Sequence, residues 1–120
     1  MTTYTIPEGQ TITNMNDTME RDYKIVIIPE GVHTIGRGSF CYNNNLQKVV
    51  IPHSIKRIER TVFEGCDKLK SISIPETVEQ IHNRAFESYH GDVLFYSYRF
   101  VGPNCIIMFQ KKIIRESLYN

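Results

Sequence analysis

Hydrophobic positions recur along this chain with a period of 23 residues. An Ile-Pro dipeptide begins at Ile28, Ile51 and Ile74, and an earlier copy at Ile6 precedes the first of these by 22 residues. Counted from each isoleucine, apolar columns fall at offsets 4, 7, 12, 18 and 21: Val32, Ile55 and Val78; Ile35, Ile58 and Ile81; Phe40, Phe63 and Phe86; Leu46 and Leu69; Val49, Ile72 and Phe95. A period of this length is typical of a solenoid, in which stacked coils bury one another's apolar faces.

Each repeat contains one predicted strand that ends at its Ile-Pro. Apolar and polar residues alternate just before the dipeptide, as they do in a half-buried strand. Proline cannot donate to a sheet ladder, so the strand ends there in every coil. We therefore expect parallel strands near 24–28, 47–51, 70–74 and 93–96. Offsets 4 to 7 should form a second short extended segment on the opposite wall, with the phenylalanine column inside.

This pattern resembles the BspA-like leucine-rich repeat. The best copy is 51–73, where Cys66 and Leu69 occupy the Cys and Leu positions of the motif. Asn43 replaces the Cys in 28–50, and Tyr89 and Asp92 replace the Cys and Leu in 74–96. The resemblance implies a leucine-rich-repeat solenoid of short parallel strands joined by turns and short 3₁₀ or helical segments. It also implies protein–protein interaction.

The length of 120 residues fits a single solenoid domain spanning 1–120. Its expected parts are a degenerate N-terminal coil at 6–27, repeats at 28–50, 51–73 and 74–96, and a C-terminal cap at 97–120. Within the cap, Cys105 to Phe109 is expected to form a strand. Gln110 to Leu118 is expected to form a short helix, because Phe109/Ile113 and Ile114/Leu118 are spaced as helical neighbours.

Composition narrows the function classes. The formal net charge is +1, so no field of one sign steers the whole molecule toward nucleic acid or an anionic membrane. The first residues lack a basic and then apolar secretory pattern, which predicts a cytoplasmic protein with no membrane partner. In that compartment Cys41, Cys66 and Cys105 are expected to be free thiols. Abundant Ile, Asn, Tyr and Lys are typical of AT-rich genomes, such as those of many phages, viruses and parasites.

The sequence predicts no catalytic residues, no metal ligands and no cofactor. The four histidines do not fall in one column and form no helical ligand pair. Arg37 and Arg60 share offset 9, which could make a short phosphate-binding stripe. Three glutamates interrupt that stripe and no aromatic residues interleave it, so a mixed solvated face is the preferred interpretation, and nucleic acid is not the expected partner.

The outward residues of the predicted strands are the candidate partner-binding surface. Their two rows contain large apolar side chains, which a solvated sheet face usually lacks: Ile27, Val50, Ser73 and Tyr96; Ile25, Lys48, Ser71 and Leu94. Two interpretations remain open. Either this face binds a protein or a second copy of the chain, or residues 10–22 or the tail at 97–120 cover it. Copies could also associate through the solenoid ends.

The functional hypothesis is therefore a non-catalytic, intracellular protein-binding module, with phage, viral or parasite origin as one interpretation of the composition. Two alternatives are an adhesin-type surface protein, which would require export, and an inhibitor of a host enzyme or of a nucleic-acid-handling complex.

Overall fold

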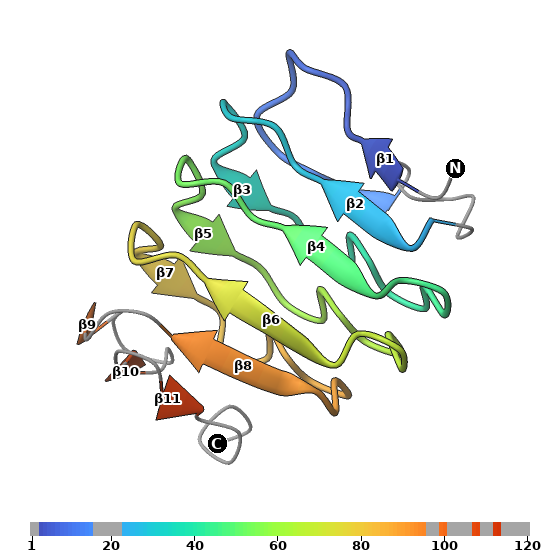
Figure 1. Ribbon diagram of the computed structural model, residues 1–120. Helices are drawn as coiled ribbons and strands as arrows, with labels where there is room; N and C mark the ends of the chain where they lie inside the picture. The colour runs from blue at the N-terminus through green and yellow to red at the C-terminus, as the bar shows by residue number, and fades with distance from the viewer. Residues whose placement is uncertain (1–2, 16–22, 96–98, 101–106, 109–111, 114–120) are drawn as a thin grey trace.

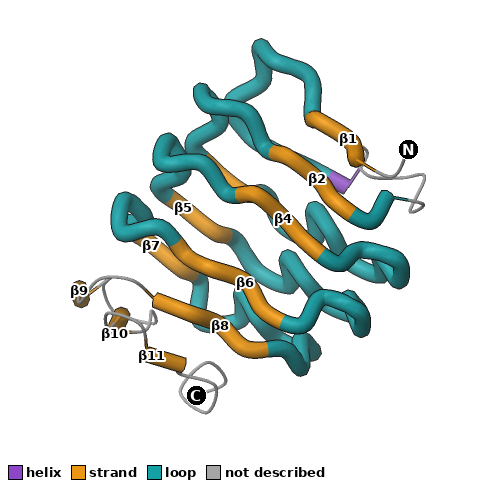
Figure 2. Tube along the Cα trace, viewed as in Figure 1, coloured by secondary structure: helices purple, strands orange, loops and turns teal. Residues whose placement is uncertain are grey.

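The computed structural model is a parallel β-solenoid of about four turns with almost no helix (Figure 1). It describes residues 3–15, 23–95, 99–100, 107–108 and 112–113. The leucine-rich-repeat solenoid predicted from the 23-residue period is thereby confirmed. Turns and irregular loops connect the strands (Figure 2).

Two walls of short strands run along the solenoid. The strand wall, which carries the strands ending at Ile-Pro, consists of β1 (Thr3–Thr5), β2 (Ile25–Ile27), β4 (Lys48–Val50), β6 (Ser71–Ile74) and β8 (Asp92–Phe95). The back wall consists of β3 (Thr34–Ile35), β5 (Arg57–Ile58) and β7 (Gln80–Ile81), and it is one continuous parallel sheet. The predicted second extended segment is therefore confirmed at offsets 6 and 7 of each coil.

The register of both walls follows the repeat. Ile25 pairs with Lys48 and Thr34 with Arg57, steps of 23 residues. Thr3 pairs with Ile25, a step of 22 that matches the shorter first repeat. The apolar columns fill the space between the walls, and Phe40, Phe63 and Phe86 stack inside with ring centroids 5.7 and 6.2 Å apart. Each of the three rings is at most 1% exposed, as the column predicted.

The register between β6 and β8 departs from the predicted period. Ile72 pairs with Val93, a step of 21 residues, so the expectation that Phe95 shares the Ile72 position is wrong. Tyr89 supplies the reason. Its buried ring packs 5.9 Å from Phe63 and its hydroxyl donates to the Leu69 carbonyl at 2.7 Å. One large side chain thus fills space that a Cys and a Leu share in the preceding coil, and the arc between Phe86 and the strand is two residues shorter.

The strand wall is divided between β4 and β6. One parallel sheet contains β1, β2 and β4, whereas β6 and β8 belong to another. Ile28 N–H donates to the Val50 carbonyl at 3.1 Å, which extends the pairing of β2 with β4 by one residue. We call this unpaired boundary between β4 and β6 the seam. The 23-residue pattern did not predict it.

Beyond β8 the described residues form three two-residue strands. β11 (Lys112–Ile113) pairs antiparallel with β8, and β9 (Arg99–Phe100) pairs antiparallel with β10 (Ile107–Met108). The predicted strand at 105–109 is present at Ile107–Met108. The helix expected over 110–118 is wrong at Lys112–Ile113, because the open edge of β8 offers backbone donors and acceptors that a strand can satisfy and a helix cannot.

Candidate functional site

The outer face of the strand wall carries the residues predicted to bind a partner. The register places Thr3, Ile25 and Lys48 in one row and Thr5, Ile27 and Val50 in the next. Beyond the seam, Ser71 lies opposite Asp92 and Ser73 opposite Leu94. Leu94 therefore belongs to the row of Val50 and Ser73, and its predicted place beside Ser71 is wrong. Tyr96 lies outside the described residues.

Apolar side chains remain accessible on this face. Val50 is 37% exposed, whereas Val49 beside it in the same strand is 9% exposed and Val26 opposite Val49 is 1% exposed. Ile25, Ile27 and Leu94 are half-buried, and Lys48, Ser71 and Ser73 are exposed. The alternation of buried and accessible positions confirms the predicted strand orientation. It leaves an apolar stretch over β2 and β4, which the outward Ser71 and Ser73 of β6 separate from Leu94 of β8.

A groove of about 460 Å³ follows the seam on this wall. Its lining includes four of the predicted binding residues together with their strand neighbours: Gln47, Lys48, Val49, Val50, Ile51, Ser71, Ile72 and Ser73. The groove therefore combines aliphatic side chains, two serine hydroxyls and strand edges that lack a ladder partner across the seam. Such mixed linings are common in binding sites, where apolar contact is combined with a few placed polar groups.

Opposite charges gather along the two edges of the strand wall, one edge formed by the beginnings of the strands and the other by their ends. Lysines stand where β2, β4 and β6 begin, and glutamates follow the Ile-Pro dipeptides where β1, β2 and β6 have ended. These residues are all exposed: Lys24, Lys48 and Lys70; Glu8, Glu30 and Glu76. His53 occupies the glutamate position after β4, and Asp92 stands at the start of β8. In the sequence, Lys24 and Lys70 share one offset and the three glutamates share another, whereas Gln47 takes the lysine offset beside Lys48.

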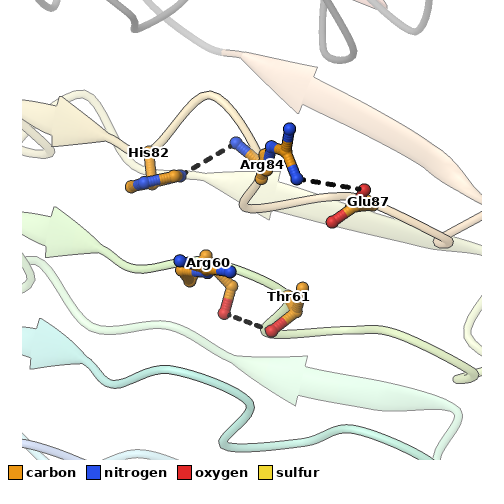
Figure 3. Close-up of polar contacts among 5 residues, drawn as sticks. All are labelled: Arg60, Thr61, His82, Arg84 and Glu87. Atoms are coloured by element: carbon orange, nitrogen blue, oxygen red, sulfur yellow. Dashed lines mark hydrogen bonds and ion pairs between the residues drawn. The ribbon is translucent and has the colours of Figure 1, made fainter.

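Arg57 lies in β5 of the back wall, and Arg60 and Arg84 lie in turns beside it. Arg57 pairs with Glu59 at 3.2 Å and Arg84 with Glu87 at 3.9 Å, between exposed or half-exposed side chains. In Figure 3 the Arg84 N–H donates to His82 Nδ1 and the Thr61 hydroxyl donates to the Arg60 carbonyl. These contacts are local to single turns. They agree with the mixed solvated face inferred from the sequence.

The thiols of Cys41 and Cys66 and the phenol of Tyr42 have neighbours within the solenoid. The Cys66 thiol is buried and donates to the Phe40 carbonyl at 2.9 Å, and the Cys41 thiol lies 3.5 Å from the Met15 sulfur. Both cysteines are free thiols, as predicted, and Cys105 lies outside the described residues. The Glu64 carboxylate raises the pKa of the Tyr42 phenol by charge repulsion, with smaller contributions from desolvation and a hydrogen bond.

The described part of the chain holds neither a cluster of metal-ligand side chains nor a membrane-spanning helix. No group of three or more His, Cys, Asp or Glu side chains is arranged to hold a metal ion there. None of its helices has the length and apolar character needed to cross a membrane.

Comparison with known families gives a match for most of the chain. The family described as a BspA-type leucine-rich repeat region (6 copies) matches residues 2–97, the part that forms the solenoid coils. No curated protein matches the chain, and no solved structure matches it.

Proposed function

Because this chain belongs to the BspA-type leucine-rich-repeat family, whose members serve protein–protein interaction or adhesion, we propose that it is a non-catalytic module that binds a protein through its strand wall. The observation that carries this proposal is the accessible apolar stretch beside the seam groove. Ile27 and Val50 lie next to each other on paired strands, and Val50 also lines the groove. A face of this kind, held by a hydrogen-bonded sheet, loses little conformational freedom on binding.

The partner contacts assigned by this proposal are the predicted residues of the two outer rows. The core of the contact is Ile25, Ile27 and Val50, with Lys48, Ser71 and Ser73 around the groove and Leu94 beyond it. Tyr96 is kept in the proposal as a candidate aromatic anchor, since aromatic residues often contribute a large share of interface energy. Placement of the protein in the cytoplasm also belongs to the proposal, and the free thiols of Cys41 and Cys66 support it.

The test is affinity capture from native lysate followed by mass spectrometry. The double variant Ile27→Asp/Val50→Asp should lose the captured protein, because two charges would be desolvated at the centre of the contact. Its thermal stability should change by less than about 1 kcal/mol, since both positions are accessible. The same protein should also be lost with Tyr96→Ala.

A matched control places the same charge on an accessible apolar residue away from the strand wall. Ile12 is 48% exposed and bridges to Thr34 of the back wall, so Ile12→Asp should retain the captured protein. Loss of capture with Ile12→Asp, or with Arg37→Ala and Arg60→Ala but not with the strand-wall variant, would assign binding to the back wall instead.

A further inference from the structure

The charges on the strand wall point to a specific partner, and we infer that this wall binds a second copy of the chain, face to face, about a two-fold axis that runs along the solenoid. This inference rests on the proposed binding role of the strand wall. It adds that one occupant of that wall is the same surface of another molecule.

The strand wall has opposite charges at the beginning and at the end of two of its strands. Lys24 precedes β2 and Lys70 precedes β6, while Glu30 and Glu76 follow the same two strands. Each of these two strands therefore begins beside a positive charge and ends beside a negative charge, and the strand residues between them are uncharged. Six residues of extended chain span roughly 20 Å. The two charges therefore stand at opposite ends of one strand.

A two-fold axis along the solenoid brings the opposite charges of two copies together. A two-fold axis along the solenoid reverses the direction of every strand but leaves each strand opposite its own copy. Lys24 then faces Glu30 of the second copy, and Lys70 faces Glu76 of the second copy, each pair occurring twice. Such a surface is self-complementary, as a closed two-fold interface requires. An axis along the strands would instead bring lysines to lysines and glutamates to glutamates, which costs energy.

The proposed contact buries the outward apolar residues of both copies. Ile27 and Val50 would meet the same residues of the second copy, and the two seam grooves would face each other and hold water, as many interfaces do. His53 replaces the glutamate after β4, so Lys48 gains no carboxylate partner in this arrangement. With a longest molecular extent of 36 Å, the shared face is small, and a weak, concentration-dependent dimer is expected.

The experiment is sedimentation velocity over a wide concentration range with wild-type protein and two charge-reversed variants. In Lys24→Glu/Lys70→Glu, β2 and β6 both begin and end beside a negative charge. In Glu30→Lys/Glu76→Lys, the same strands begin and end beside a positive charge. Each variant alone should dimerise at least about tenfold more weakly than wild type, since every pair becomes repulsive. An equimolar mixture should recover the wild-type dissociation constant, because each variant is complementary to the other.

The matched control reverses two exposed charges away from the strand wall, Lys56→Glu with Glu79→Lys, and should leave the dissociation constant unchanged. Circular dichroism of each variant checks that it remains folded. Wild-type protein that stays monomeric at all concentrations would overturn the inference. So would a dimer that is insensitive to Val50→Asp and to both charge reversals.

These outcomes are separable from failure of the proposed function. A monomeric wild-type chain that still captures another protein, and loses it with Ile27→Asp/Val50→Asp, contradicts self-association but supports the binding role. A dimer abolished by charge reversal and restored by mixing supports the inference whether or not a further protein is captured.

Discussion

Left-handed backbone recurs at fixed residue positions in the turns of this solenoid. At offset 14 the φ angles of Tyr42, Gly65 and Ser88 are 59°, 76° and 60°, and at offset 10 those of Gly38 and Thr61 are 65° and 53°. Only glycine adopts this conformation without steric cost. The turn geometry is therefore imposed by coil stacking, and Thr61, which is β-branched, is the residue least suited to its place.

Replacement of Thr61 by glycine should stabilise the protein. Relief of the left-handed strain, roughly 1–2 kcal/mol, exceeds the entropy cost of a new glycine, which is about 0.5–1 kcal/mol. A net gain of about 0.5 kcal/mol is expected in urea denaturation. Thr61→Val retains the branched Cβ and should show no gain. A loss of more than about 1 kcal/mol in Thr61→Gly would mean that the Thr61 hydroxyl bond to the Arg60 carbonyl dominates.

Truncation of Phe63 should be among the most damaging single changes. Its ring is fully buried and lies between those of Phe40 and Phe86, so Phe63→Ala opens a cavity in the middle of the stack. The expected loss is about 3–5 kcal/mol in the free energy of unfolding. Tyr42→Ala in the neighbouring coil, where the ring is 55% exposed, serves as the control and should cost less than about 1 kcal/mol. A small loss at Phe63 would show that the stack collapses to fill the space.

At the scale of elements, the sequence predicted the strands but not the way they join. Val49 and Ile72 occupy equivalent columns, and the repeat on each side of the seam has 23 residues, so nothing local distinguishes β4–β6 from β2–β4. Pairing between whole coils depends on their spacing. The phenylalanine rings, however, lie 5.7 Å apart at the seam and 6.2 Å apart at the next step, where β6 and β8 do pair, so the width of the stack does not account for the seam.

The β6–β8 register shows a different limit of sequence reasoning. A prediction from fixed offsets assumes that every coil has the same number of residues between its phenylalanine and its strand. Tyr89 fills the space of two smaller side chains, and its hydroxyl reaches the Leu69 carbonyl, so the arc shortens by two residues while Phe86 keeps its place. In the repeat 74–96, Tyr89 and Asp92 occupy the Cys and Leu positions of the motif, and these two changes indicated a departure from the regular coil. The amount of the shift follows only from three-dimensional packing.

The seam predicts a difference in amide hydrogen exchange between equivalent residues. The N–H groups of Ile6 and Ile28 donate to the carbonyls of Ile27 and Val50 at 3.0 and 3.1 Å. Ile51, the equivalent residue, follows β4 at the seam, where β4 and β6 belong to different sheets. Its amide should therefore exchange up to about tenfold faster than that of Ile28, the factor that one hydrogen bond provides. Equal protection of Ile28 and Ile51, measured by NMR under native conditions, would show that the seam closes in solution.

For the molecule as a whole, the question is whether the seam divides the solenoid into two cooperative units. The strand wall is interrupted there, but the back wall runs unbroken through β3, β5 and β7. The turns also continue across it, since Phe40 N–H donates to the Val62 carbonyl and Val62 N–H to the Ala85 carbonyl. In a repeat protein, such nearest-neighbour contacts decide cooperativity. Two of three connections between the coils thus survive at the seam.

We therefore expect a single unfolding transition that includes both sides of the seam. In urea, the NMR signals of Ile35 and Ile81, one on each side, should disappear with the same midpoint, and far-UV circular dichroism should follow them. Phe63→Ala should lower both midpoints equally, because the ring contacts coils on both sides of the seam. Two separated midpoints in the wild type, or a Phe63→Ala effect confined to Ile81, would contradict this expectation. The back wall and phenylalanine stack would then be too weak to couple coils that the strand wall does not join.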